Sequence, residues 1–426
     1  MRPSSRNSAP LAPFLPGLDC FFRSPLLVQI AVVALAAFAL HVIWIGVGFN
    51  IVMYGYYAGG KVFLNGQNPY EVTLSLGLNN SYKYSPQFAL LAGKMAEAGF
   101  DGRQAASWVL ALYTLASTTV FAAGLCRWHD FRKQHPGALL PLCMLAACAA
   151  ALLDLVVSTG VYQVNAFAIG LILAGLASCR DHHHARAGAL LLCATLFKVY
   201  AVVFLFILAL RFKPRFWLGA LAAGSIMFLL PVPWVGWAHD FDTHLAWVKS
   251  TLSVAGTYTI LDLRSAFEHV GLATLGGTLR WLVIIVTLPV FFIYGVVVRK
   301  PDWRPWLTCG IAAILLISPK TEVFTFVFLA ASYIMMVDWC ADSDAPFFKK
   351  YGAPLFALCA VTIASMRFID PVWYKSENPN EIVRVLGALV IWGLCAWILS
   401  AAACRRLRAV FGHVERAFPP VPAIGT

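Results

Sequence analysis

Charged side chains are scarce in this chain of 426 residues, since Asp, Glu, Lys and Arg together make up only 12% of it. Soluble domains carry roughly twice that share. Acidic residues are the scarcer kind, with 20 Asp and Glu against 32 Lys and Arg, whereas hydrophobic residues make up 60% of the chain. This composition excludes a soluble enzyme and a disordered protein, and it indicates a protein that lies within a membrane.

Two other patterns are missing. The apolar stretches are continuous rather than alternating, which excludes a transmembrane β-barrel. The eleven cysteines lie in apolar segments or near their ends on the predicted inner side, and their spacing matches no zinc site. A secreted disulfide scaffold is therefore excluded, and we expect neither a metal nor a cofactor.

What the chain does have is a series of apolar runs, each close to the roughly 20 residues that a helix needs to cross a bilayer. The predicted fold class is all-α: a polytopic membrane protein with about ten spans and one re-entrant helical hairpin. The predicted spans are 27–48, 104–126, 138–157, 162–178, 216–236, 280–298, 305–318, 323–338, 353–368 and 383–402.

The apolar segment 187–211 differs from the spans, because Lys198 lies at its centre and basic residues flank both of its ends. We interpret it as a hairpin of two short half-helices that enters and leaves on the same side, with Lys198 near the tip. The alternative is one full span in which Lys198 faces the protein interior. The hairpin is favoured because it keeps the later basic clusters inside, and an ionisable residue at membrane depth is by default a functional hypothesis.

The basic residues gather in short clusters between the spans, so the positive-inside rule predicts the topology. With the hairpin, the inner face carries the whole net charge of +12. Both termini are then cytoplasmic, with a tail over 1–26, a transmembrane domain over 27–403 and a second tail over 404–426. The charge therefore indicates topology and not a nucleic-acid partner.

The first predicted outer loop, 49–103, is long and rich in aromatic, glycine and amide residues. Helical spacing over 51–64 places Tyr57 and Lys61 on one face, and the composition of 65–70 predicts a turn. Aromatic faces and amides suit a carbohydrate ring. The same composition also suits a helix that lies in the headgroup region of a membrane.

Several short motifs stand out between residues 56 and 319. They are YYAGG at 56–60, GQNPY at 66–70, YSPQFALL at 84–91, GVYQVN at 160–165, ATLFK at 194–198 and SP at 318–319. Together they resemble glycosyltransferase family 87, whose members are polyprenyl-phosphate-sugar-dependent enzymes of the GT-C superfamily. The resemblance covers most of 45–325.

The resemblance implies a GT-C-like fold whose outer loops cover a cavity facing the periplasm, and hence a multi-pass protein of the cell inner membrane. It implies an enzyme that moves a sugar, mannose before others, from a polyprenyl-phosphate donor to a lipid or glycan acceptor amid membrane lipids. The phosphate leaving group needs cations. Together with the loop composition, the resemblance points to these substrate-binding residues: Tyr57, Asn68, Tyr70, Tyr84, Gln163, Asn165, Lys198, Arg264 and Lys320.

The reaction also needs a carboxylate that deprotonates the acceptor hydroxyl, and here the chain departs from the family pattern. Family members carry an aspartate just before the paired aromatics of the first loop, where this chain has Val52. Asp154 is the first candidate replacement, followed by Glu71 and Glu322. Asp154 could equally be an ion-pair partner or a helix-end residue, and Glu71 could serve the turn of the first loop.

Other interpretations stay open at this point. An acceptor that is already ionised needs no base, and neither does a protein that binds a lipid-linked sugar without turning it over. A secondary transporter would show paired halves with matching broken helices, and only 187–211 is broken here. Residues 239–244 have the Asp-x-Asp spacing of a cation site, but we interpret them as a turn that opens an amphipathic helix over 243–252, with Asp242 as its N-cap.

Overall fold

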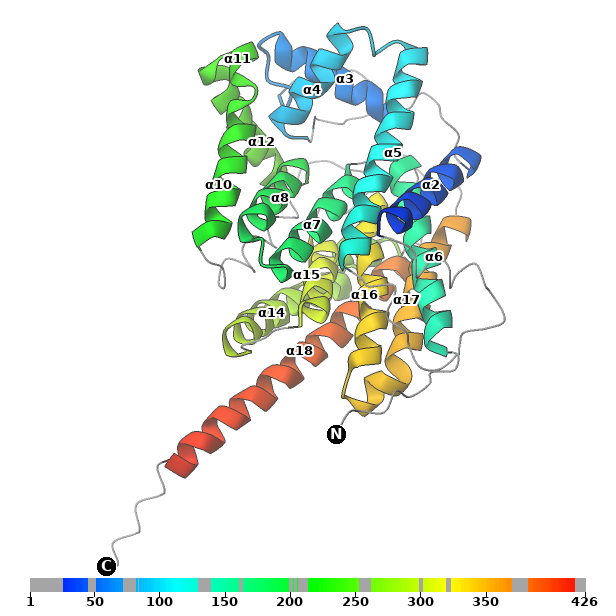
Figure 1. Ribbon diagram of the computed structural model, residues 1–426, viewed down its shortest axis with the longest axis vertical. Helices are drawn as coiled ribbons and strands as arrows, with labels where there is room; N and C mark the ends of the chain where they lie inside the picture. Colours follow the sequence, from blue (N-terminus) through cyan, green and yellow to red (C-terminus); the bar gives the residue numbers. More distant parts are fainter. Residues whose placement is uncertain are drawn as a thin grey trace, which may run out of the picture.

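The computed structural model describes residues 26–44, 51–71, 82, 84–128, 139–160, 164–198, 202, 205, 214–252, 262–298, 302–318, 323–369 and 382–417. These residues form helices and turns and contain no strand, which confirms the all-α prediction (Figure 1). The helices are α2 (Leu26–Trp44), α3 (Ile51–Leu64), α4 (Pro86–Glu97), α5 (Arg103–Trp128), α6 (Leu139–Gly160), α7 (Asn165–Arg180), α8 (His184–Phe197), α10 (Pro214–Leu229), α11 (Val232–Val235), α12 (Trp237–Leu252), α13 (Leu263–Glu268), α14 (Ala273–Val297), α15 (Trp303–Ile317), η2 (Val323–Phe326), α16 (Val327–Asp342), η3 (Phe348–Gly352), α17 (Ala353–Ile369) and α18 (Ile382–Ala417).

Within these residues, four helical segments are long and apolar enough to cross a membrane. They are Leu139–Val156, Pro214–Val235, Ala273–Val297 and Ile382–Ala409. Shorter apolar helices accompany them, and α10 and α14 leave large side chains such as Leu221 and Leu288 exposed. A helix that is apolar on its exposed face has lipid as its natural surroundings. The chain is thus a helical membrane protein, while the ten crossings stay a prediction.

The segment around Lys198 is broken, as the hairpin interpretation requires. Helix α8 ends at Phe197, and Lys198 has an extended backbone. A single continuous helix over 187–211 is therefore wrong. Helix α10 then begins beside the start of α8, where a Cβ on Gly188 would lie 2.1 Å from the carbonyl oxygen of Phe216. Both helices therefore start at the same end of the pair and run side by side in the same direction.

Helices α3, α4 and α11 lie together at one end of the molecule, at the top of Figure 1. Helix α3 has the bounds that the spacing over 51–64 predicts. It packs closely on α4, since a Cβ on Gly60 would lie 2.2 Å from the backbone nitrogen of Gly93. Only glycine permits so close an approach of two backbones. The first-loop residues therefore form a compact helical pair at this end.

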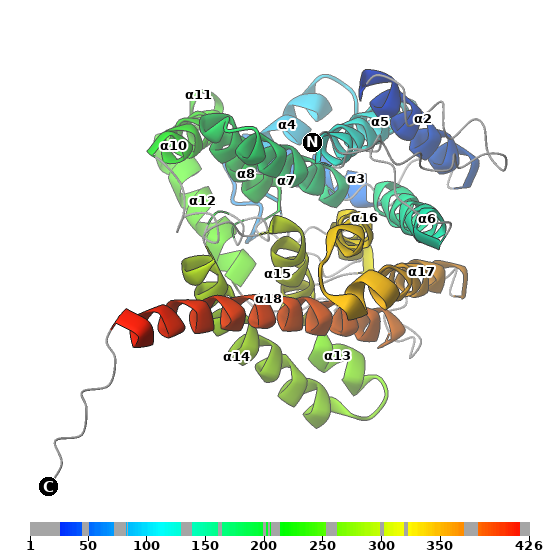
Figure 2. The ribbon, with the colours of Figure 1, turned by 60° about the horizontal axis from the view of Figure 1, so that its bottom comes forward.

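The opposite part of the molecule is a bundle crossed by the long helix α18. Helices α15 and α16 lie on one side of α18, and α13 and α14 lie on the other (Figure 2). The bundle core contains the fully buried side chains of Trp306, Tyr333 and Phe356. Helix α18 continues to Ala417, beyond the boundary at 403 that the apolar run suggests.

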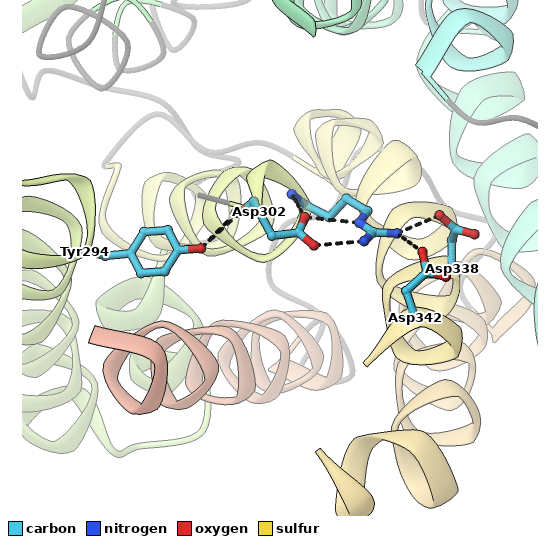
Figure 3. A network of polar contacts seen from close by, with 5 residues as sticks. Tyr294, Asp302, Asp338 and Asp342 are labelled. Carbon is cyan, nitrogen blue, oxygen red and sulfur yellow. Dashed lines mark hydrogen bonds and ion pairs between the residues drawn. The ribbon is translucent and has the colours of Figure 1, made fainter. Parts of the chain in front are cut away.

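An ion-pair network around Arg304 joins three of these helices (Figure 3). The guanidinium donates hydrogen bonds to Asp302 at 2.8 Å, to Asp338 at 2.8 Å and to Asp342 at 2.9 Å. The hydroxyl of Tyr294, on α14, accepts from the backbone nitrogen of Asp302 at 2.9 Å. The network ties the start of α15 to the end of α16 and to α14.

Candidate functional site

Five aromatic rings of the first loop form one cluster, here called the tyrosine cluster: Tyr56, Tyr70, Tyr82, Tyr84 and Phe88. The ring of Tyr56 meets Tyr84 edge-on at 4.6 Å between centroids and Phe88 at 4.9 Å. Tyr82 lies 5.7 Å from Tyr70 and 5.8 Å from Tyr84. Edge-to-face contacts of this kind fix ring positions. Helix α3, the turn after it and the start of α4 each contribute to the cluster.

Hydrogen bonds hold the cluster and the adjoining turn. The Tyr56 hydroxyl donates to the Tyr84 hydroxyl at 3.0 Å, and the Tyr70 hydroxyl donates to the backbone carbonyl of Tyr84. Asn68 accepts from the backbone nitrogen of Tyr70 at 3.1 Å and donates to Glu71 at 2.9 Å. The predicted turn over 65–70 is confirmed, and Glu71 lies exposed within the same turn. Burial raises the pKa of the Tyr70 phenol, so this side chain is a neutral hydrogen-bond donor at pH 7.

The structure brings Lys198 to the tyrosine cluster. Its ammonium nitrogen lies 6.0 Å from the centroid of the Tyr84 ring. This distance is at the limit of a cation–π interaction. Lys198 stands at the end of α8, so the hairpin segment and the first loop meet there. Two residues that the sequence marks separately, Lys198 and Tyr84, thus belong to one site.

Tyr57 and Lys61 occupy the α3 face next to the cluster. The Tyr57 side chain is buried, and its hydroxyl has no hydrogen-bond partner among the described residues. Burial raises the pKa of Tyr57, with a smaller contribution from Asp101. Lys61 forms a 2.5 Å ion pair with Asp101, and the hydrogen bond from Lys61 lowers the pKa of Asp101. This exposed ion pair links the end of α3 to the turn before α5.

Asp154 and Asn165 lie in the interior, on α6 and at the start of α7. Asp154 is only 1% exposed, and the Tyr333 hydroxyl of α16 donates to its carboxylate at 3.0 Å. Asn165 is fully buried. Gln163, Lys320 and Glu322 lie outside the described residues.

Arg264 lies apart from the tyrosine cluster. It is exposed on α13, whose N-cap Asp262 accepts from the backbone nitrogen of Ser265 at 2.9 Å. The same carboxylate pairs with Arg280 at 3.6 Å. Helix α13 lies beside α14, across the molecule from α4 (Figure 2). Among the predicted substrate-binding residues that the structure describes, Lys198 therefore adjoins the first loop, whereas Arg264 does not.

The interpretation of residues 239–244 as a turn is wrong. Gly236, with a φ of 79°, ends α11, and α12 begins at Trp237, so the six residues are helical and Asp242 is not an N-cap. Helical spacing places Asp240 and His244 on one face. Asp240 is fully buried, and His244 contacts Gln87 of α4 at 2.7 Å between the side-chain nitrogens. The i, i+4 spacing is a signal that could have revealed this pair.

Comparison with known proteins gives one family match. The model described as "Glycosyltransferase family 87" matches residues 82–319, which is more than half of the chain. The matched range includes Tyr84, Asp154, Lys198 and His244. No curated protein matches the chain.

Proposed function

The chain belongs to glycosyltransferase family 87, and from this premise we propose that it moves a sugar from a polyprenyl-phosphate donor to a lipid or glycan acceptor. Mannose is the proposed sugar. The proposed setting is the outer face of the cell inner membrane, with both termini in the cytoplasm, because that orientation places the basic clusters inside. The contact between Lys198 and the first loop is the observation that carries the proposal.

The role proposed for Lys198 is to stabilise the phosphate leaving group. As the sugar departs, negative charge develops on the phosphate, and a cation fixed beforehand stabilises that charge more in the transition state than in the ground state. The ring of Tyr84 supports the position of the ammonium group at 6.0 Å. Lys198 also stands directly after the end of α8, with an extended backbone.

The tyrosine cluster is proposed to bind the sugar. Its rings offer apolar faces, and Tyr56, Tyr70 and Tyr84 offer hydroxyl groups that hydrogen bonds already orient. A carbohydrate ring presents the matching combination of apolar C–H faces and hydroxyl edges. Tyr57 has a buried hydroxyl without a partner among the described residues and is proposed to add a further hydrogen bond.

Asp154 is the candidate base that the sequence suggests first. Its carboxylate is buried and accepts from Tyr333, a contact that also supports a role in joining α6 to α16. Glu71 contacts Asn68 in an exposed turn, which supports a role in that turn. The Asp154→Asn variant keeps the shape and removes the charge, so it separates the two roles of Asp154.

The experiment that tests the proposal measures sugar transfer by the purified protein in lipid nanodiscs. The donor is labelled polyprenyl-phosphate mannose and the acceptor is a membrane-lipid extract. We expect Lys198→Ala to lower the transfer rate by roughly 10²–10³-fold, the usual cost of losing one group that stabilises the developing negative charge.

The matched control is Lys94→Ala. Lys94 belongs to the same first loop, but it pairs with Glu97 at 2.7 Å and lies 6.0 Å from the Trp234 ring. The control should transfer sugar at the wild-type rate. An unchanged rate in Lys198→Ala, or an equal loss in both variants, would contradict the role given to Lys198.

A further inference from the structure

The carboxylate of Asp240 is in an unusual position. The residue is fully buried, and neither carboxylate oxygen makes a hydrogen bond within the described residues. Nδ1 of His244 lies 3.3 Å from Oδ1 of this carboxylate. Burying a carboxylate is costly unless it is paired or used. The first turn of α12 is a favourable place for a negative charge, because the helix dipole is positive there.

The contacts of His244 fix its tautomer. Nδ1 lies 2.9 Å from the backbone carbonyl oxygen of Asp240, which can only accept, so Nδ1 carries the proton. On the other side of the ring, the Gln87 amide nitrogen donates to the backbone carbonyl of Met227 at 2.9 Å, which orients the amide. The same nitrogen lies 2.7 Å from Nε2 of His244 and therefore donates to it. Nε2 thus presents a lone pair, as a proton acceptor does.

The His244 ring and Lys198 both have neighbours at or just before the start of α4. Gln87 lies in the first turn of α4, and Tyr84, whose ring adjoins Lys198, lies three residues earlier. Residues 84–87 therefore adjoin Lys198 through the Tyr84 ring and contact the His244 ring through the Gln87 amide. In Figure 1, α12 lies between α10 and the helical pair α3 and α4.

We propose that His244 is the catalytic base of this enzyme and that Asp240 is its positioning residue, an inference that rests on the proposed glycosyl transfer. The acceptor hydroxyl takes the place of the Gln87 N–H at Nε2. Its O–H bond breaks as the oxygen bonds to the anomeric carbon of the sugar, and the bond from that carbon to the phosphate oxygen breaks. The proton goes to Nε2, and the electron pair leaves with the polyprenyl phosphate toward Lys198.

Asp240 acts after the proton has moved. The ring then carries a positive charge, with Nδ1 at 3.3 Å from the buried carboxylate, which stabilises the imidazolium. In this proposal the pair of Asp240 and His244 takes the role of the aspartate that the resemblance implies at Val52. Among the described residues that contact the ring from other elements, Gln87 and Phe228 have no titratable group, so Asp240 sets the charge environment.

The test compares His244→Gln with the wild type in the mannose-transfer assay. We expect the rate to fall by roughly 10²–10⁴-fold, the range for loss of a general base. The Kd for polyprenyl phosphate should stay unchanged. In the wild type the pH–rate profile should rise as the imidazole loses its proton, and this limb should vanish in the variant. His244→Ala should regain activity when imidazole is added, a rescue that a purely structural histidine would not show.

Matched controls lie on the same helix. His239→Gln and the exposed Asp242→Asn should transfer sugar at the wild-type rate, whereas Asp240→Asn should slow transfer and shift the pH–rate profile. A His244→Gln protein with the wild-type rate and pH profile would overturn the inference, as would loss of the pH limb in Asp154→Asn alone. If the wild type itself transfers no sugar from any donor, the proposed glycosyl transfer is wrong, and the role of His244 as its base is wrong with it.

Discussion

At the level of single residues, function depends on where polar groups meet the first loop. Lys198 is the basic residue that the apolar segment 187–211 singles out, and its ammonium group lies against the ring of Tyr84. Sequence alone identifies both residues by their type and motif. It does not identify the contact, because the two segments become neighbours only when α8 packs beneath the first loop. His244 was missed for a related reason, since its partner Gln87 comes from another helix.

The Tyr84 ring provides a test at this scale. Tyr84→Phe keeps the aromatic face next to Lys198, whereas Tyr84→Leu removes it. A cation–π contact contributes about 0.5–2 kcal/mol, so we expect the leucine variant to bind polyprenyl phosphate roughly 2- to 30-fold more weakly. Binding titration gives the two Kd values. Equal binding by the two variants would show that the ring face does not support the lysine.

At the level of helices, apolar runs predict the elements well because each run must satisfy its own backbone hydrogen bonds. Helix α3 agrees with the spacing over 51–64, and α8 ends where the hairpin interpretation places the break. The sequence predicts a start for α12 that is too late. The apolar run before it continues to Gly236 without a visible break, and Asp242 is a residue type that commonly caps helices. Such a boundary depends on one backbone angle and not on the pattern of side chains.

The Arg304 network gives a prediction for the helical bundle. Arg304→Ala leaves three carboxylates without their shared partner, so we expect a loss of about 1–3 kcal/mol in stability and a lower melting temperature. Arg304→Lys should lose part of this, because an ammonium group cannot form the same fork of hydrogen bonds. Arg180→Ala, which removes an exposed pair with Asp181, is the control and should melt close to the wild type. Equal melting of Arg304→Ala and the control would contradict the assigned role.

At the level of the whole molecule, the described helices form a bundle with the first-loop pair α3 and α4 at one end (Figure 1). The long helix α18 crosses the opposite part. The residues proposed to bind the donor therefore lie in a different part of the molecule from the Arg304 network, which joins helices of the bundle. Composition predicts the class of protein, and the family match covers 82–319. Neither specifies which sugar is moved, because the ring contacts that select it arise only in the folded site.

The most direct measurement is the stoichiometry of a single turnover by the purified wild-type protein. The donor carries one label on mannose and another on the polyprenyl phosphate, and a membrane-lipid extract supplies the acceptor. Our account predicts that free polyprenyl phosphate and a mannosylated acceptor appear together in a one-to-one ratio. Donor that binds but yields neither product, with every acceptor fraction and every polyprenyl-phosphate sugar offered, would contradict it and identify a protein that only binds the lipid-linked sugar.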